Sequence, residues 1–526
     1  MFNKLYFTII LSFIAHSYVF ADKYDDNNYQ PDNITVKLEE TNLPIVFIDT
    51  QNQVIHKDWR IAVRMKIINN VNGINYGDTI NHPNQTVDYE GWIGIKYRGN
   101  SSFDAAKKPY SIKTLKTNNP DGKKDKVKIL DLPADNDWVL LAPYADRSMI
   151  RDILMFQLAR PYFEWVPTLR HCEMILDGIY YGVYMIGERP GKGKKRLNLD
   201  DPGDSGDELT GGYQVQIDRN DEEYVYISKY PAVNKNGNPY YSQREIYFQY
   251  KHPEYDDMMP DHPIQLNYIQ HQIDLMENAL SSKDFMDPYV GYRQYLNMLS
   301  FIDYQLSQEV SNNIDGYRLS TNLYKHRDSV DPLFKTTLWD FNIAFGNVNY
   351  CGGDRTDTWI YDNSYTGNQP NKVPFWWMRL MKDPNYVNQL KIRWQQYRKG
   401  FYSDKHIEQT IDSLVNNLDV KEARNRNYIA WSVWNKYVWP VPNWQTVNTY
   451  EKEIENLKKW LKERIAWLDN EFEYNNYSGI ETVQKSGTKL QIKDYYTLHG
   501  IKLNNTCKGI TIIKYKDGNV RKIFNR

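Results

Sequence analysis

The residues best placed to carry chemistry in this 526-residue sequence are two aspartates, Asp315 and Asp340. Residues 317–324 and 334–339 have the composition of β-strands, and a polar loop separates them. If they form a hairpin centred near residues 327–328, the two aspartates face each other at its open end, within about 8 Å. Facing carboxylates repel unless one is protonated or a cation lies between them. A hard divalent cation with oxygen ligands fits this arrangement, and Mg²⁺ keeps room for substrate phosphates. Two solvated aspartates at strand ends are the alternative interpretation.

The segments that precede this pair predict a strand-rich first part of the chain. Residues 60–68 alternate apolar and polar side chains, which is typical of a half-buried strand. Asp177-Gly178 stands between two alternating runs and suits a hairpin turn, because both turn residues need positive φ. Asp146 is the predicted N-cap of a helix. The runs beside Asp177-Gly178 are 172–176 and 179–186, and further strands are predicted at 43–49, 92–98, 108–114, 213–217, 224–227 and 246–250.

From residue 263 onward, apolar side chains recur at spacings of three and four, which predicts helices. One begins at 263, and others cover about 294–310, 375–399, 405–418 and 448–470. The fold class predicted from these patterns is α+β, with a strand-rich N-terminal part and a helix-rich C-terminal part. Residues 478–526 follow a linker-like break and form a small β-rich tail.

Charge and cysteine content exclude several classes of protein. The chain has 65 basic and 66 acidic residues, a balance that argues against nucleic acid as the main partner. Its three cysteines, Cys172, Cys351 and Cys507, are too few for a disulfide framework and lack metal-ligand spacing. The 43 tyrosines and 15 tryptophans suit core packing, with an aromatic surface for sugars as the alternative.

The N-terminus has the layout of a secretory signal peptide. Lys4 is followed by a mostly apolar run at 5–20, and Val19 and Ala21 suit the −3 and −1 positions of a cleavage site. The run is shorter than the about 20 residues of a spanning helix, which favours cleavage after residue 21 over an uncleaved anchor. No later segment is apolar enough to span a bilayer. We therefore expect an exported protein that begins near Asp22 and has no transmembrane segment after cleavage.

Several short motifs follow one another along residues 43–470. Around the aspartate pair they are Asn313-Ile314-Asp315-Gly316, Leu323-Tyr324-Lys325 and Trp339-Asp340-Phe341-Asn342. The others are Arg98-Gly99-Asn100-Ser101-Ser102 with Lys107-Lys108-Pro109-Tyr110, Asp137-Trp138 with residues 146–151, residues 178–188 (GIYYGVYMIGE) and residues 209–213 (LTGGY). Each motif alone is weak, but in this order they resemble the CotH (spore coat protein H) family of atypical secreted kinases.

The resemblance implies an atypical protein-kinase-like, two-lobed fold that binds ATP and Mg²⁺. It also implies phosphorylation of an exported protein on serine or threonine. The implied parts are an N-terminal lobe at about 43–190, a β-rich insertion at about 190–255 and a C-terminal lobe at about 260–473, within a domain of 43–473.

The resemblance also implies roles for single residues. Asp315 orients the acceptor hydroxyl, and Asp340 and Asn342 lie at the Mg²⁺ site. Lys108 contacts phosphate with Glu188 as its ion-pair partner, while Lys113 is the alternative lysine, and an ordinary strand residue is the competing interpretation of each. The phosphate-side turn is formed by Arg98, Gly99, Ser101 and Ser102, since turns of small residues present N–H groups.

Two positions depart from the family pattern. Asn342 stands where the family often has a second Asp, and Ser320 stands where it often has Asn. Because Asn342 removes a negative charge, ATP binding with little turnover is an alternative outcome. The competing classes are a surface adhesin or glycan-binding protein on the same fold, and a glycoside hydrolase with carboxylates about 5 Å or about 6.5–9.5 Å apart. The resemblance argues against the hydrolase.

The tail carries its own pattern. Asp517-Gly518 lies between residues 512–515 and 520–524 and predicts a hairpin, and the chain ends in basic residues. The final part resembles the C-terminal sorting domain of the type IX secretion system of Bacteroidota, although Thr511 stands where Tyr is usual. This resemblance implies passage through the periplasm to the cell surface or the medium. An ordinary terminal β-subdomain is the alternative.

Overall fold

The structure is a computed structural model that describes residues 29–365, 371–474, 492–496, 502–504, 509–515 and 520–525. The chain separates into two compact units, Met1–Tyr474 and Asn475–Arg526. The predicted signal peptide lies outside the described residues. Within the described ranges, no helix combines the length and the apolarity needed to cross a membrane.

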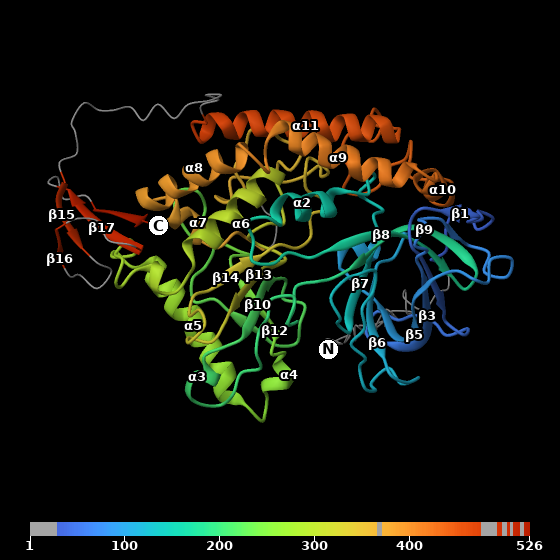
Figure 1. Ribbon diagram of the computed structural model, residues 1–526, viewed down its shortest axis with the longest axis horizontal. Coiled ribbons are helices and arrows are strands. Elements are labelled where there is room, and N and C mark those ends of the chain that lie inside the picture. Colours follow the sequence, from blue (N-terminus) through green and yellow to red (C-terminus); the bar gives the residue numbers. More distant parts are fainter. Residues whose placement is uncertain are drawn as a thin grey trace, which may run out of the picture. The chain divides into compact units, whose positions relative to one another are not determined.

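A closed β-barrel forms the first part of the larger unit (Figure 1). Neighbouring strands are antiparallel except β2 and β8, which are parallel and close the barrel. Every second side chain along a strand points to the same face, so alternate apolar residues fill the interior of the barrel. In β3, for example, Val63, Met65 and Ile67 are fully buried. In order around the barrel, the strands are β2 (Ile45–Asp49), β3 (Ile61–Ile68), β5 (Val87–Tyr97), β6 (Tyr110–Leu115), β7 (Asp137–Leu141), β9 (Ile179–Gly187) and β8 (Leu169–Leu176).

The predicted hairpin at Asp177-Gly178 is confirmed as β8–β9. Leu176 pairs with Ile179, and φ is 49° at Asp177 and 79° at Gly178. These two positive values match the backbone twist that a two-residue hairpin needs. The predicted helix N-cap at Asp146 is wrong: α2 spans Arg151–Ala159, because the Asp146 carboxylate accepts the N–H groups of Ser148 and Arg151 and caps the turn before the helix.

A second, five-stranded antiparallel sheet follows in the order β11 (Val225–Ile227), β12 (Tyr247–His252), β10 (Tyr213–Asp218), β13 (Thr321–Lys325) and β14 (Lys335–Thr337). Residues 190–255 thus supply three of its strands. The predicted register of the β13–β14 hairpin is wrong. Asn322 pairs with Thr337, so the midpoint falls between 329 and 330 and not at 327–328. Asp315 therefore precedes the strand and does not lie at its open end.

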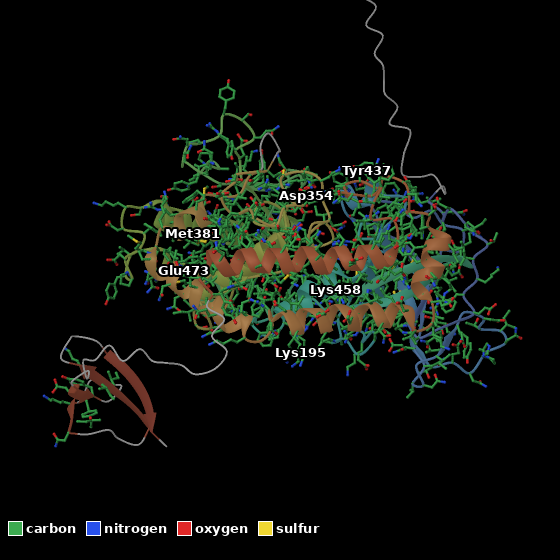
Figure 2. The ribbon with its side chains drawn as sticks, turned by 90° about the horizontal axis from the view of Figure 1, so that it is seen from above. Lys195, Asp354, Met381, Tyr437, Lys458 and Glu473 are labelled. Atoms are coloured by element: carbon green, nitrogen blue, oxygen red, sulfur yellow. The ribbon has the colours of Figure 1, made fainter. Side chains whose placement is uncertain are left out.

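Helices cover this sheet in layers, with α9 and α11 above α2 and α6 in Figure 1 and the sheet below them. Figure 2 shows α11 from above, with Lys458 near its middle. Trp376, Trp377 and Trp394 are fully buried in the core that joins these layers. The α+β class is thus confirmed. The main helices are α5 (Pro263–Ser281), α6 (Met298–Ser311), α7 (Trp376–Leu380), α8 (Pro384–Arg398), α9 (Asp404–Asp419), α10 (Ala423–Ala430) and α11 (Tyr450–Glu471).

Short elements complete the larger unit: β1 (Glu40–Thr41), β4 (Asn75–Tyr76), α1 (Ser101–Asp104), α3 (Gly206–Leu209), α4 (Tyr255–Met258) and the 3₁₀ turn Tyr292–Gln294. The smaller unit is a four-stranded antiparallel sheet in the order β16 (Lys502–Leu503), β15 (Ile492–Tyr496), β17 (Gly509–Tyr515) and β18 (Val520–Asn525). The two strands of the predicted terminal hairpin are present as β17 and β18, and their Asp517-Gly518 turn lies outside the described residues.

Candidate active site

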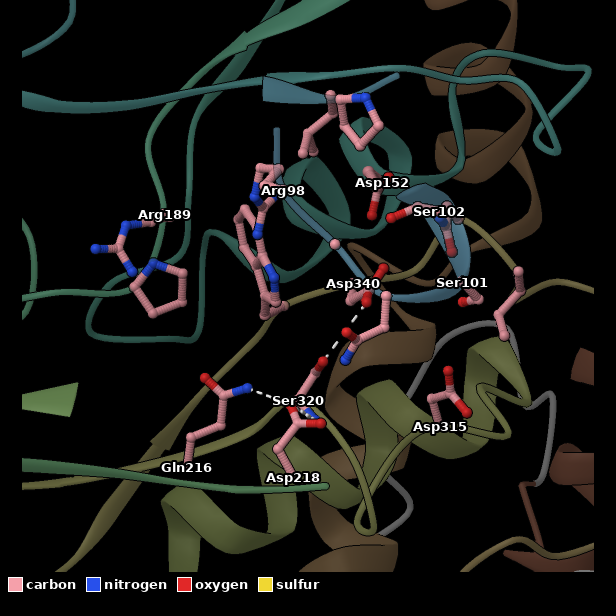
Figure 3. A pocket seen from close by; sticks show the side chains of 18 of the residues that line it. Arg98, Ser101, Ser102, Asp152, Arg189, Gln216, Asp218, Asp315, Ser320 and Asp340 are labelled. Carbon is pink, nitrogen blue, oxygen red and sulfur yellow. Dashed lines mark hydrogen bonds between the residues drawn. The ribbon is translucent and has the colours of Figure 1, made fainter. Parts of the chain in front are cut away.

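A cavity of about 240 Å³ lies among residues of the barrel, helix α2 and the five-stranded sheet (Figure 3). The segment between β5 and α1 contributes Arg98, Gly99 and Asn100, and α2 contributes Asp152. Strand β10 ends at the cavity with Asp218, and the segment after β14 contributes residues 339–343 except Phe341. Polar side chains from distant parts of the chain therefore share one space.

Asp340 is a half-buried acid of the cavity. Its backbone is left-handed, with φ of 64°, and the Asn313 side-chain amide donates to its carbonyl oxygen at 3.0 Å. The Ser320 hydroxyl donates to its carboxylate at 3.5 Å. Burial, followed by the nearby charge of Asp315, raises the pKa of Asp340 to about 6, and Arg98 opposes this rise. A non-glycine residue held at positive φ in a cavity is a common feature of functional sites.

Asp315 lines the same cavity from the turn between α6 and β13. Arg318 donates to its carboxylate at 2.9 Å and also donates to the carbonyl oxygen of Ile314 at 2.7 Å. The same guanidinium donates to the Asn371 carbonyl oxygen at 3.0 Å. The structure therefore brings the two predicted aspartates into one cavity, through a turn that Arg318 fixes and not through the end of a hairpin.

Two further acids of the cavity were not among the predicted site residues. Asp152 is only 3% exposed, and burial, followed by the charge of Asp340, raises its pKa to about 8. Asp218 is also buried, and burial raises its pKa, while it accepts the N–H of Ser320 at 3.1 Å. Asp152 directly follows the 146–151 motif, and Asp218 directly follows the strand predicted at 213–217. Both acids could therefore have been predicted as site residues from their positions, one next to a motif and the other at the end of a strand.

Four cations line the cavity, and Arg98 differs from the other three. Arg189 donates to Asp137 at 2.9 Å, Arg219 lies 3.5 Å from the Asp218 carboxylate, and Lys251 pairs with Glu222. Among the described residues, no carboxylate lies within ion-pair distance of the Arg98 guanidinium, which stacks over the Trp339 ring at 5.2 Å. Burial, followed by the charge of Arg189, lowers the pKa of Arg98 to about 10, so it stays cationic at neutral pH.

Beside Arg98, the predicted turn of small residues lines the cavity with Gly99, Ser101 and Ser102. Gly99 has φ of 85°, and a Cβ atom there would lie 2.1 Å from the Ser102 hydroxyl oxygen. Any larger residue would both strain the backbone and displace Ser102. The turn therefore requires glycine at position 99 if the hydroxyls of Ser101 and Ser102 are to line the cavity.

The structure does not bring the predicted lysines to the cavity. The Lys108 ammonium is buried, donates to the Phe103 carbonyl oxygen at 2.5 Å and lies 3.8 Å above the Tyr29 ring. The predicted Lys108–Glu188 ion pair is wrong, because Glu188 lies 3.7 Å from Arg196 and accepts the Thr168 N–H. Lys113 pairs in register with Asp137 on the neighbouring strand and is also absent from the cavity lining.

The donor set of the cavity fits a hard divalent cation. Asp340 and Asp315 offer carboxylate oxygens, and Asn342 and Ser320 line the same space with an amide and a hydroxyl group. In the described part of the chain, no group of three acidic, histidine or cysteine side chains is arranged to enclose a metal ion by itself. Mg²⁺ usually takes only one or two protein carboxylates and fills its remaining positions with water and substrate phosphates, so the two observations agree.

Comparison with family models matches residues 95–468 to the family described as CotH kinase protein. The match covers more than half of the chain and includes every residue that lines the cavity. A search of curated proteins gives no match.

Proposed function

The chain belongs to the CotH kinase protein family, and from this membership and the cavity we propose that it is an ATP-dependent phosphotransferase. The acceptor we propose is a serine or threonine hydroxyl of an exported protein. The observation that carries the proposal is one cavity in which the Arg98 cation and a Gly/Ser turn share space with Asp340 and Asp315. In the same proposal, the barrel corresponds to the N-terminal lobe of a kinase and the helix-covered sheet to the C-terminal lobe.

The proposed residue roles follow from charge and position. Arg98, with the hydroxyls of Ser101 and Ser102, binds phosphate oxygens, since a guanidinium and small polar groups suit them. Asp315 accepts a hydrogen bond from the acceptor hydroxyl and takes up its proton. The hydroxyl oxygen then bonds to the γ-phosphorus, the bond from that phosphorus to the β–γ bridging oxygen breaks, and ADP leaves with the electron pair. Mg²⁺, when held by Asp340, supplies neutralisation of the phosphate charge.

The size of the cavity has a consequence for binding. Its volume of about 240 Å³ is smaller than the roughly 300–1,000 Å³ of typical ligand pockets. A whole nucleotide therefore requires the cavity to widen. Arg98, which rests on Trp339 in the structure, is the side chain that we expect to move when phosphates enter.

Two substitutions test the proposal. Asp340→Ala is expected to abolish Mg²⁺-dependent ATP binding, measured by isothermal titration calorimetry, because the metal loses its carboxylate. Asp315→Ala is expected to keep binding and to lose transfer of labelled phosphate, because only the group that orients the acceptor is gone. A wild-type protein that binds no ATP in the presence of Mg²⁺ would contradict the proposal. Binding without transfer in the wild type would identify a pseudokinase, the outcome that Asn342 favours.

We further propose that the chain is exported, with the predicted signal peptide removed near Asp22 and the tail acting as a sorting domain. The support is the sequence pattern of residues 1–21 and 478–526. Intact-mass measurement of the exported protein is expected to show residues 1–21 missing.

An aromatic surface favours glycan binding as a second candidate function. Trp439 and Tyr437 are each 48% exposed, and Trp439 stacks on Tyr350 with ring centroids 5.9 Å apart (Tyr437 is labelled in Figure 2). Exposed aromatic rings suit the apolar faces of sugars. A glycan array on which Trp439→Ala loses signal would support this candidate, and an empty array for the wild type would remove it.

A further inference from the structure

We propose that Asp152 supplies the second carboxylate of the divalent-cation site, opposite Asp340. This inference rests on the proposed function, because it adds a ligand to the site at which Asp340 is placed. Neither the motif that surrounds Asp340 nor the predicted site residues include Asp152, which comes from helix α2, far away in the sequence.

The position of Asp152 is that of a ligand-facing acid. Its side chain lines the cavity although only 3% of the residue's surface is exposed. One carboxylate oxygen accepts the Phe341 N–H at 2.7 Å. Among the described residues, no hydrogen-bond donor reaches its other oxygen. Figure 3 shows Asp152 and Asp340 turned toward the same part of the cavity, beside Ser102.

The neighbouring Arg151 holds Asp152 in place. Its guanidinium donates to Asp146 at 2.6 Å and to Glu453 of α11 at 2.8 Å, and it also donates to the Ala344 carbonyl oxygen at 3.2 Å. Arg151 is 1% exposed, so these bonds lie out of water. The start of α2 is therefore tied to both ends of the 341–344 segment, through Asp152 at Phe341 and through Arg151 at Ala344. A carboxylate held in this way is preorganised for a ligand.

Charge gives the second reason. Asp152 is buried, and it lines the same cavity as Asp340, so two carboxylates share one small space. Carboxylates placed in this way repel each other. No lysine, arginine or histidine in the described residues forms an ion pair with Asp152. A divalent cation between the two carboxylates would offset this repulsion. Asn342 brings an uncharged amide where the family often has an acid, and Asp152 would supply the negative charge that is missing there.

A purely positioning role through Phe341 is the competing explanation, and one substitution separates the two. In Asp152→Asn the side-chain carbonyl oxygen still accepts the Phe341 N–H, but the negative charge is gone. Loss of cation affinity in this variant therefore reports the charge and not the anchoring of the loop. Hydrogen exchange of the peptide that spans residues 339–345 provides the check, since it is expected to match the wild type.

The experiment is titration calorimetry with Mn²⁺ on the full chain, with and without a non-hydrolysable ATP analogue. We expect the Mn²⁺ dissociation constant of Asp152→Asn to rise about tenfold or more. The matched control is Glu277→Gln. It changes another buried carboxylate, which is held by Ser228 and Trp376 and does not line the cavity. We expect the Mn²⁺ dissociation constant of this variant to equal that of the wild type. An unchanged dissociation constant in Asp152→Asn would overturn the inference while leaving the proposed function intact. If the wild type binds Mn²⁺ but no ATP, the proposed function is contradicted and the proposed cation site is not.

A second measurement needs no variant. Fe²⁺ with ascorbate and peroxide cleaves a protein backbone beside the bound cation. Fragments of the wild type that end near residue 152 as well as near 340, and disappear with excess Mg²⁺, support the inference. Cleavage near 340 without cleavage near 152 contradicts it.

Discussion

The Arg98 guanidinium lies at the cavity beside side chains that do not neutralise its charge. Trp339 supplies an aromatic face, and Arg189, whose charge lowers the pKa of Arg98, is engaged by Asp137. Burial alone would raise the pKa of Asp137, but the charge of Arg189 lowers it to about 2. The Arg189–Asp137 pair therefore stays ionised at neutral pH. Arg98 thus keeps its donors available for an anion, whereas a buried lysine such as Lys108 uses its donors within the protein.

Replacing Arg98 tests this assignment. Arg98→Ala is expected to weaken ATP binding by about 2 kcal/mol, or about thirtyfold, because charge-assisted hydrogen bonds to phosphate are lost. Titration calorimetry in the presence of Mg²⁺ measures the change. Lys113→Met is the control, since Lys113 lies on a barrel strand outside the cavity. Equal losses in both variants would show that the phosphate cation is misassigned.

At the scale of elements, α10 contacts the barrel through the Arg426–Glu173 ion pair and through the buried side chain of Asn427. The Asn427 side-chain oxygen accepts from the Lys107 ammonium at 2.8 Å and from the Val183 N–H at 3.0 Å. Gly182, on the same strand, permits this approach, because a Cβ atom there would lie 2.4 Å from the Asn427 oxygen. The Lys107 ammonium also donates to the Val183 carbonyl oxygen at 2.5 Å. Burial lowers the pKa of Lys107 well below its usual value, so the ammonium depends on these two acceptors.

Asn427→Ala is therefore expected to destabilise the protein by about 3 kcal/mol, because the buried Lys107 ammonium keeps only the Val183 carbonyl oxygen and the Val183 N–H group loses its acceptor. Thermal and denaturant unfolding measure the loss. Asn425→Ala, an exposed position of the same helix, is the matched control and is expected to change stability little. Similar stability of the two variants would mean that Asn427 does not secure α10.

Glu277 links α5 and α7 and makes stability depend on pH. Its carboxylate accepts from the Ser228 hydroxyl at 2.7 Å and from the Trp376 indole at 2.9 Å, and burial raises its pKa from 4.5 to about 7. The folded state thus binds a proton that the unfolded state releases above pH 4.5. The stability that this proton gives is complete below pH 4.5 and is lost as pH rises through 7, a change of about 3 kcal/mol.

In Glu277→Gln this loss is absent, because the amide stays neutral and still offers an acceptor to Trp376. The variant is expected to gain stability over the wild type between pH 5 and pH 8, measured by unfolding at both values. A constant difference across this range would show that Glu277 does not titrate in the folded protein.

Elements whose signals are local were predictable, and those that depend on distant partners were not. The β8–β9 hairpin depends on two adjacent turn residues and was predicted from them. Helix α10 was missed because its buried positions, Ala423, Asn427 and Ala430, carry small or polar side chains and leave no apolar stripe. The β13–β14 register was displaced because β14 has three residues and its loop gave no length signal. Asp152 joins the site only through tertiary packing, which periodicity cannot reveal.

At the scale of the whole molecule, the barrel extends beyond the segment that the family model matches. Residues 95–468 match the family, yet β2 and β3, which lie before residue 95, are two of the seven barrel strands. Strand β2 pairs with both β3 and β8 and so closes the barrel. Because barrel strands place Arg98 and its turn beside the cavity, a truncated protein that begins at residue 95 lacks part of the site's support.

The tail allows the last prediction. Residues 475–526 form a compact unit of their own, and in the described residues its strands pair only with one another. Deleting residues 478–526 is therefore expected to leave the unfolding temperature and the ATP affinity of the larger unit unchanged. If the tail is a sorting domain, the truncated protein also stops in the periplasm while the full chain reaches the cell surface or the medium, which fractionation and immunoblotting measure. Surface export of the truncated protein would rule out the sorting role, and a loss of ATP binding would show that the tail supports the larger unit after all.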